Sequence, residues 1–301
     1  MTWVSDAAAL ELLERAGPFE SEAYRNSCVA VLGGAADASF GASADDGTIA
    51  AIALVRQGRT AHLPFGYSGV RASRRLDAEE LWPFLRAARR ACGAQRLIVH
   101  DALESASGGR VVAWTSFAYL DEPPVERFAS KARQSMRRAV RAGATCKTTA
   151  DPTVFAGLYG QASRAWGVTY PLDLIAAAAE RGVARFIDIN VDGRGVGSLA
   201  VLQGVTHWMY WLAAQNEVGR RAEVGYLGVA AMLEEARAAG AAFVNLGASA
   251  GLPGVAQFKK RVGGVERPVL EWRDSSAILR FADSSLAVIA RQRRARRGSA
   301  S

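Results

Sequence analysis

Hydrophobic and polar positions in the first 120 residues follow two periods, one typical of helices and one typical of strands. The helical period is clearest after Asp77, where Leu81, Phe84, Leu85 and Ala88 fall on one face. Helices are predicted at 5–16, 20–32 and 77–92. Strands are predicted at 38–43, 48–56, 59–64, 95–100 and 110–120, before Pro123-Pro124 interrupts the chain.

The second half of the chain repeats this order of elements. Predicted helices span 125–142, 152–165, 171–181, 222–239 and 253–261, and predicted strands span 184–191, 196–203, 206–214, 242–247 and 266–272. Residues 195–216 carry no charge, but their alternation around Gln203-Gly204 favours a buried hairpin over a membrane-spanning helix. A last helix is predicted to begin near Ser275 and to run into an arginine-rich end.

Helices, an antiparallel meander and a helix–strand pair therefore occur twice, which is the order expected of GNAT-type acyltransferases. The predicted fold is α/β with a mixed sheet, built from two tandem GNAT-like domains at 1–124 and 125–272. The C-terminal helix, residues 273–301, is expected to pack with the first domain. The alternative is a single mixed α/β domain with an irregular insertion.

Composition describes a globular chain with a basic excess. Half of the residues are hydrophobic and 22% are charged, and the formal net charge is +8. The excess is concentrated between Arg127 and Lys147 and in five arginines near the end: Arg291, Arg293, Arg294, Arg296 and Arg297. Such a balance suits nucleic acid, a phosphorylated substrate or an anionic membrane surface, although a basic tail can also serve only solubility.

Cysteine and histidine usage argues against a metal site or a disulfide framework. The three cysteines are widely spaced without a C-x-x-C pair, and the three histidines lack ligand-like spacing. No metal is therefore expected. The N-terminus carries Asp6, Glu11 and Glu14 where a signal peptide would be basic and then apolar. These features predict a cytoplasmic protein with no integral membrane segment.

The predicted helix 125–142 has an apolar stripe and a basic stripe. The apolar positions are Val125, Phe128, Ala132, Met136, Ala139 and Val140, and the basic positions are Arg127, Lys131, Arg133, Arg137, Arg138 and Arg141. Like charges on one face repel one another, so a polyphosphate partner would relieve an energetic cost. The alternative is a solvated surface helix.

The stretch 242–264, AFVNLGASAGLPGVAQFKKRVGG, is the most specific signal in the chain. A predicted strand ends at Gly247, and a short helix then presents Phe258 and Lys259 before the Gly263-Gly264 pair. A cation fixed in this way beside a cleft could stabilise an oxyanion or hold a terminal phosphate. Without further context, the same run would be an ordinary solvated helix end.

This stretch resembles the C-terminal signature of the FemABX-like aminoacyltransferases, in which a strand ending in Gly precedes Phe-Lys and a Gly pair. Three other segments are similar to the same family in the expected order, GPFESEAY (17–24), LPFGYSG (63–69) and SRAWGVTYP (163–171). The basic KARQSMRRAVRAG (131–143) resembles the helix that opens the family's second domain. The resemblance implies transfer of an aminoacyl group from aminoacyl-tRNA to an amine.

Carried over by position, the resemblance places Lys259 at the reaction centre, with Phe258 shaping the same pocket. It implies that Tyr67, Arg164 and Tyr210 bind the acceptor, although Tyr67 and Tyr210 could equally be packing residues. The chain lacks the long coiled-coil arm of some family members and is rather short for a peptidoglycan-building enzyme. A secondary-metabolite intermediate, as in antibiotic biosynthesis, is therefore as good an acceptor as a peptidoglycan precursor.

The donor is a second open point. Acetyl-CoA enzymes of this fold bind pyrophosphate on a Gln/Arg-x-x-Gly-x-Gly/Ala loop, which QNEVGRRAEVGYLG (215–228) does not match. Arg220 and Arg221 could still contact a phosphate. These features favour aminoacyl-tRNA as co-substrate, without a separate cofactor, over a CoA thioester. The alternatives are acyl-CoA-dependent N-acylation and a non-enzymatic pair of domains that binds RNA, and the general base is not identified.

Overall fold

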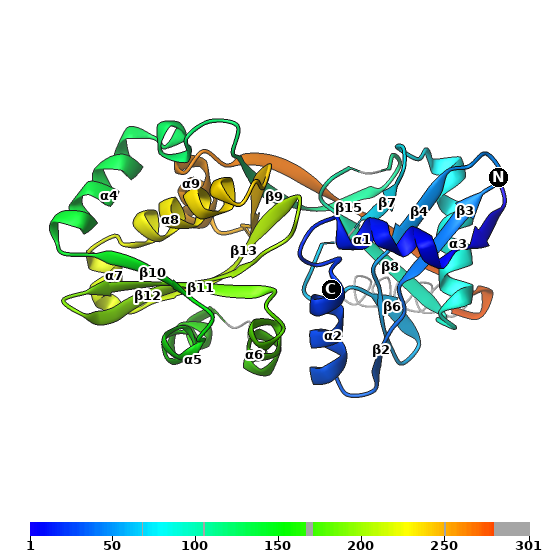
Figure 1. The fold of residues 1–301 in the computed structure, drawn as a ribbon, viewed down its shortest axis with the longest axis horizontal. Helices are drawn as coiled ribbons and strands as arrows, with labels where there is room; N and C mark the ends of the chain where they lie inside the picture. Colours follow the sequence, from blue (N-terminus) through cyan, green and yellow to red (C-terminus); the bar gives the residue numbers. More distant parts are fainter. Residues whose placement is uncertain (68, 105, 167–170, 250, 280–301) are drawn as a thin grey trace, which may run out of the picture.

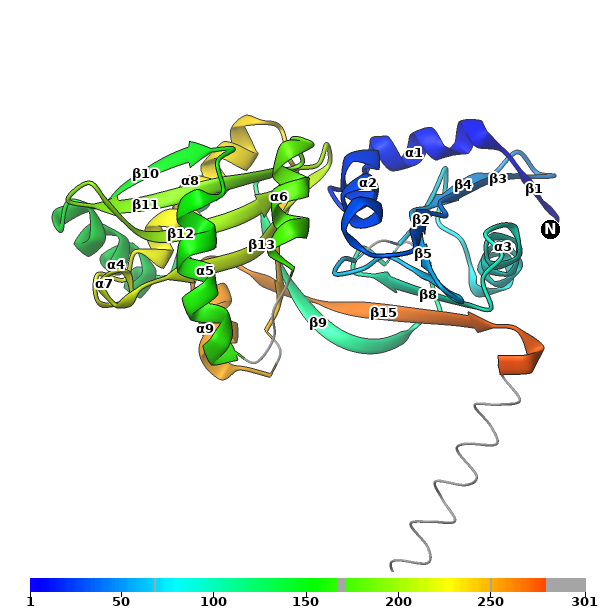
Figure 2. The same cartoon turned by 90° about the horizontal axis from the view of Figure 1, so that it is seen from below.

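The computed structural model describes residues 1–67, 69–104, 106–166, 171–249 and 251–279, with the side chains of 164–166 excepted. The chain forms two α/β lobes, as Figure 1 shows. Two long strands, β9 (Arg110–Tyr119) and β15 (Val265–Ser275), run from one lobe to the other and pass below the first lobe in Figure 2. The predicted α/β class with a mixed sheet is confirmed.

The first lobe contains a four-stranded sheet, β1-β3-β4-β7, and part of a larger sheet. Its helices are η1 (Ala7–Leu10), α1 (Glu11–Glu14), α2 (Glu22–Val31) and α3 (Ala78–Ala91). Its strands are β1 (Trp3–Ser5), β2 (Ala35–Asp37), β3 (Phe40–Ala44), β4 (Ile49–Ile52), β5 (Val55–Gln57), β6 (Thr60–His62), β7 (Val70–Ala72) and β8 (Arg96–Asp101). Helix α3 begins at a capping box between Asp77 and Glu80, as expected from a strong sequence start signal.

The second lobe is a sheet with helices on both faces. Helices α4 (Ser130–Arg141), α8 (Gly225–Ala238) and α9 (Pro253–Arg261) lie on one face in Figure 1, and α5 (Thr153–Trp166) and α6 (Leu172–Glu180) lie on the other. The remaining elements are η2 (Pro124–Arg127), α7 (Glu217–Arg221), β10 (Thr145–Thr149), β11 (Ala184–Val191), β12 (Arg194–Leu202), β13 (His207–Gln215) and β14 (Phe243–Ala248). The charge-free stretch forms the β12–β13 hairpin, as predicted.

One eleven-stranded sheet continues through both lobes in the order β10-β11-β12-β13-β14-β9-β15-β8-β6-β5-β2. Strand β9 comes from the first half of the sequence but pairs with β14, and β15 comes from the second half but pairs with β8. Each half of the sequence thus supplies a strand that pairs with a strand from the other half. Residues 273–275 belong to β15 rather than to the predicted terminal helix, and 280–301 lie outside the described residues.

A hydrophobic core also joins the two lobes. Tyr24 from α2 meets Phe155 and Tyr159 from α5 and Trp211 from β13 in one buried cluster, and the phenolic oxygen of Tyr24 donates to the Pro64 carbonyl at 2.9 Å. Burying side chains of this size stabilises a fold by about 1.5–3 kcal/mol each. The lobes are therefore packed against each other as parts of one core.

A buried polar junction lies beside this core. Glu20 forms an ion pair with Arg71, and the ring of His207 stacks on Phe243 with centroids 4.7 Å apart. A Cβ placed on Gly17 would lie only 2.0 Å from His207 Cε1 and 2.8 Å from Glu20 Oε2. Burial lowers the pKa of His207 to about 3, with the charge of Arg71 adding to the shift, so the imidazole is neutral at pH 7.

Two predicted elements differ from the structure, and four short elements were not predicted. The segment 125–142 is divided into η2 and α4, because the backbone is extended at Phe128 and Ala129, and Val140 is 54% exposed instead of joining the apolar stripe. The segment 48–56 is divided into β4 and β5, because the chain passes there from one sheet to the other. The short elements β1, β2, β7 and α7 carry too few residues to show a period.

Among the helices of the described residues, none is both long and apolar enough to cross a membrane.

Candidate functional site

Strands β13 and β14 separate at the centre of the second lobe. Their parallel pairing covers only His207–Met209 against Phe243–Asn245. Just beyond it, β13 has a bulge, since Tyr210 pairs with Val201 and Leu212 with Ala200. The β14–β9 ladder shifts between Asn245 and Ala248. Two bulges at the same level bend the strands apart and leave backbone groups between them that do not pair with each other.

Lys259, from α9, fills this separation. Its Nζ donates hydrogen bonds to the carbonyl oxygens of Gly247 and Ala248, each at 2.7 Å, and the residue is only 3% exposed. Burial lowers the pKa of Lys259 to about 8, so the ammonium form still predominates at pH 7. These two carbonyls satisfy two of the three N–H groups of the ammonium.

The segment that supplies these two carbonyls is fixed at the Gly247 N–H by a polar pair that the sequence analysis did not identify. Asn245 Oδ1 accepts from the Gly247 N–H at 2.9 Å and from Thr115 Oγ1 at 2.6 Å, and both side chains are buried. Gly247 has a φ of +76°, which favours glycine, and a Cβ there would lie 3.2 Å from Met209 Cε. A polar Asn within an apolar strand is the signal that could have pointed to this pair.

Phe258 connects Lys259 to the beginning of α8. Its ring lies 4.9 Å from the Tyr226 ring, and a Cβ on Gly225 would be 3.8 Å from it. The residue that precedes α8, Val224, provides no side-chain cap, so no capping side chain satisfies the first N–H groups of this helix. Uncapped N–H groups at a helix start can bind an anion.

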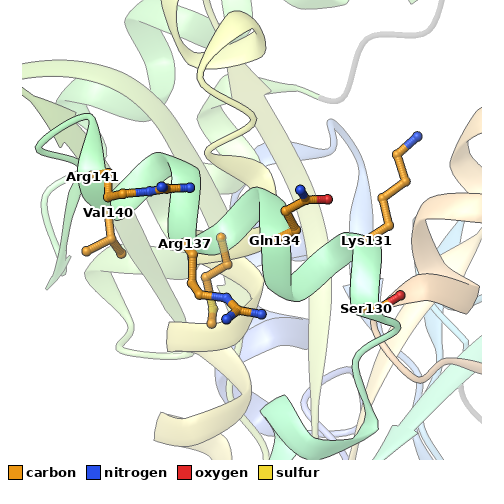
Figure 3. A pocket seen from close by; sticks show the side chains of 7 residues that line it. Ser130, Lys131, Gln134, Arg137, Val140 and Arg141 are labelled. Carbon is orange, nitrogen blue, oxygen red and sulfur yellow. The ribbon is translucent and has the colours of Figure 1, made fainter.

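Helix α4 carries the basic groove, which we define by Lys131, Gln134, Arg137 and Arg141. Figure 3 shows these side chains projecting from α4 along a surface hollow that Ser130, Met136 and Val140 also line. Among the described residues, none of the three cations has an acidic partner within ion-pair distance. Their charge is thus not compensated within this part of the protein.

The other predicted phosphate ligands are engaged within the protein. Arg133 donates to the Phe128 carbonyl at 2.6 Å, and Arg138 pairs with Glu223 at 3.0 Å. Arg221 pairs with Glu217, and Arg220 donates to the Gln215 carbonyl at 3.0 Å. Lys131, Arg137 and Arg141 thus lie on one helix without an acidic partner in the described segments, although Arg137 Nε donates to the Arg133 carbonyl at 3.4 Å.

The predicted acceptor residues lie in three different settings. Tyr67 is half-buried between the lobes, with its ring edge-on to Phe19 at 6.4 Å. The Tyr210 side chain packs against the core under α8, where burial raises its pKa well above the ordinary value, while Trp211 packs on the opposite face. Arg164 is on α5, but its side chain is outside the described residues. Their role in acceptor binding stays a prediction.

Within the described residues, no three His, Cys, Asp or Glu side chains are grouped as metal ligands would be. Cys28 is buried and Cys146 is partly buried, and burial raises the pKa of Cys28 to about 12 and that of Cys146 to about 11. Thiols with such pKa values are poor nucleophiles at neutral pH.

Comparison with known proteins bears on the fold of the chain. Residues 127–260 match the family model described as an acetyltransferase (GNAT) domain. No curated protein matches the sequence. FemX has a similar structure at 12% identity, with a TM-score of 0.69 over 91% of this chain and 97% of FemX.

Two further solved structures share the arrangement. One is the C-terminal domain of a protein assigned as a lysylphosphatidylglycerol synthetase from Agrobacterium fabrum, at 17% identity, with a TM-score of 0.56 over 93% of this chain and 96% of that one. The other is a tandem GNAT protein from the clavulanic acid biosynthesis pathway, at 16% identity, with a TM-score of 0.51 over 91% and 97%. The expected FemABX-like tandem GNAT fold is confirmed, and the matches support an acyltransferase.

Proposed function

We propose that this protein transfers an aminoacyl group from aminoacyl-tRNA to an amine acceptor and forms an amide bond. The observation that carries the proposal is the buried Lys259 ammonium, fixed by the Gly247 and Ala248 carbonyls where β13 and β14 separate. The uncompensated basic groove on α4 supports a polyphosphate carrier for the donor. The resemblance to the FemABX-like enzymes implies the same donor.

In the proposed reaction, the uncharged acceptor amine attacks the carbonyl carbon of the aminoacyl ester. A C–N bond forms, and the carbonyl electrons move onto oxygen, where the third N–H of Lys259 donates a hydrogen bond. Collapse of this intermediate breaks the ester C–O bond, and the ribose hydroxyl leaves with a proton that originates from the amine. A preorganised donor of this kind accelerates acyl transfer by about 10²–10³.

The contact between α4 and α9 indicates where the donor would lie. The backbone N–H of Ala129, which precedes α4, donates to the carbonyl of Arg261, at the end of α9, at 2.8 Å. A carrier whose phosphates lie along Lys131, Arg137 and Arg141 would therefore end near the helix that carries Lys259. We expect the reaction in the cytoplasm, where charged tRNA is present.

A second candidate function is N-acylation from a CoA thioester. It is favoured by the uncapped start of α8 beside Phe258, which could bind pyrophosphate, and by the acetyltransferase family match. The acceptor is open in both cases. It is an amine of a biosynthetic intermediate or of a peptidoglycan precursor, and Tyr67, Arg164 and Tyr210 are proposed to bind it.

The deciding experiment is a donor screen with the purified chain. Charged tRNA pools or CoA thioesters are mixed with hydroxylamine and a set of biosynthetic amines, and products are identified by mass spectrometry. Product that requires intact tRNA and disappears after ribonuclease treatment supports the leading proposal. Product from a CoA thioester, with release of free thiol, supports the second. RNA binding without transfer from any donor would contradict both.

A further inference from the structure

An apolar groove lies at the opposite end of α9 from the basic groove. Val112 and Trp114 of β9 form one wall, and Leu252 and Pro253 at the start of α9 form another. Trp114 is 56% exposed and Leu252 is 55% exposed, which is unusual for side chains of this size. The floor includes Ala248, whose carbonyl also accepts from Lys259 at 2.7 Å.

The groove is on the donor side of the sheet. Alternate residues of a strand share a face, so Trp114 faces the same way as Ala118, which packs in the core under α8. Three features therefore lie one after another along the axis of α9. Arg261 adjoins α4, Lys259 follows, and Pro253 borders the groove. Three to six residues separate Lys259 from the groove end of α9, which is roughly 4.5–9 Å at the helical rise of about 1.5 Å per residue.

One wall of the groove is acidic. Glu266 of β15 lines it, is exposed, and forms no ion pair with any side chain in the described segments. An uncompensated carboxylate beside an apolar surface suits a ligand that carries a cation next to an apolar group. An aminoacyl ester has that chemistry, because its free α-ammonium and its side chain are attached to the same carbon.

We propose that this groove selects the transferred group, and that the donor is an apolar amino acid of medium or large size. Its side chain lies against Trp114, Val112 and Leu252, and its α-ammonium faces Glu266. The inference rests on the proposed function, since it assumes transfer at Lys259. Ala248 connects the groove to the reaction centre, because it lines the groove and its carbonyl accepts from Lys259.

The test compares donors that differ only in the amino acid. Phenylalanyl-, leucyl-, glycyl- and aspartyl-tRNA are offered with hydroxylamine, and initial rates are measured at limiting donor. We expect phenylalanyl or leucyl transfer to exceed glycyl transfer by about tenfold or more, and Trp114→Ala to reduce that ratio toward one. Val205→Ala, which truncates an exposed side chain on the β12–β13 hairpin, should leave the ratio unchanged.

The carboxylate is tested with a donor that lacks the ammonium. Wild-type protein should use N-acetylphenylalanyl-tRNA about tenfold or more slowly than phenylalanyl-tRNA, and Glu266→Gln should remove most of this difference. If glycyl and aspartyl donors react as well as phenylalanyl and leucyl donors, and Trp114→Ala changes no ratio, this inference is overturned while the proposed function stands. If the wild-type protein is a dimer in solution and Trp114→Ala makes it a monomer, the groove is a contact between two copies and the inference is overturned too. Failure of every charged tRNA would instead refute the proposed function.

Discussion

Lys259 Nζ and the carbonyl oxygen of Gly247 lie 2.7 Å apart, although twelve positions separate the two residues in the sequence. The contact closes the loop between β14 and α9 and fixes a cation in the space where β13 and β14 diverge. Asn245 holds the Gly247 N–H from the other side of the same peptide segment. The ammonium therefore has a fixed position before any substrate binds, which is the condition for efficient charge stabilisation.

Replacing Lys259 with Met should abolish most of the transfer activity without unfolding the protein. The methionine keeps an unbranched apolar stem but cannot donate a hydrogen bond to an oxyanion, so we expect the rate to fall by about 10²–10³. Circular dichroism and single-turnover rates would check this. Lys260→Met is the matched control, because Lys260 is exposed on the same helix and should retain the wild-type rate. Normal turnover by Lys259→Met would exclude the mechanism.

The rate of transfer should fall as pH rises through about 8, the pKa to which burial lowers Lys259. Below this pH the side chain is an ammonium and can donate to the oxyanion, and above it the charge is lost. Hydroxylamine is a suitable acceptor because it is already uncharged at neutral pH, and the rate without enzyme is subtracted at each pH. A rate that rises through pH 8 would instead mean that neutral Lys259 acts as a base.

The same pKa predicts how Lys259 affects stability. The residue has an ordinary pKa of 10.5 in the unfolded chain and about 8 in the folded protein. Between these values the unfolded state binds more protons, so the contribution of Lys259 to the free energy of unfolding increases with pH across this window. Denaturant titrations of wild type and Lys259→Met at pH 7.5 and pH 10 should show a wild-type gain that the variant lacks. Parallel curves for the two proteins would argue against a buried, shifted lysine.

Removing the three cations of the basic groove should weaken tRNA binding in a salt-dependent way. Each phosphate contact contributes about 0.9 to the slope of log K against log salt concentration, or somewhat less for single strands. The triple variant Lys131→Ala, Arg137→Ala, Arg141→Ala should therefore reduce that slope by about 2–3. Arg237→Ala, an exposed arginine on α8, serves as the control. An unchanged slope in the triple variant would exclude the groove as the carrier site.

Gly17→Ala should destabilise the protein, because the new Cβ would overlap His207 Cε1 and crowd Glu20 Oε2. Forcing an extra methyl group into such a packed junction costs about 1–3 kcal/mol. Gly157→Ala is the contrasting variant, since its Cβ meets nothing within 4 Å on helix α5 and should stabilise by about 0.5–1 kcal/mol. Thermal unfolding of both variants measures the difference. Equal stability of the two would show that the junction is loosely packed.

Much of the fold was predictable from the sequence, since long amphipathic segments such as α3 and the β12–β13 hairpin have clear periods and turn residues. The sequence draws attention to Lys259 because Gly247, Phe258 and Gly263-Gly264 bracket it within one local stretch, and its role at the reaction centre stays a prediction from the resemblance. The contribution of Thr115 could not be predicted, because it lies 130 positions from Asn245 and the two side chains meet only when β9 pairs with β14. Likewise, periodicity reports which residues are buried but not which arginines of α4 find acidic partners.

The crossing of β9 and β15 between the lobes also limits how the polypeptide can be divided. Cut near residue 124, the N-terminal fragment would keep β9 but lose its neighbours β14 and β15, and the C-terminal fragment would keep β15 but lose β8 and β9. Each fragment would then expose unpaired strand edges that favour aggregation. Separately expressed halves should accordingly be insoluble alone and recover a native sheet only when they are produced together.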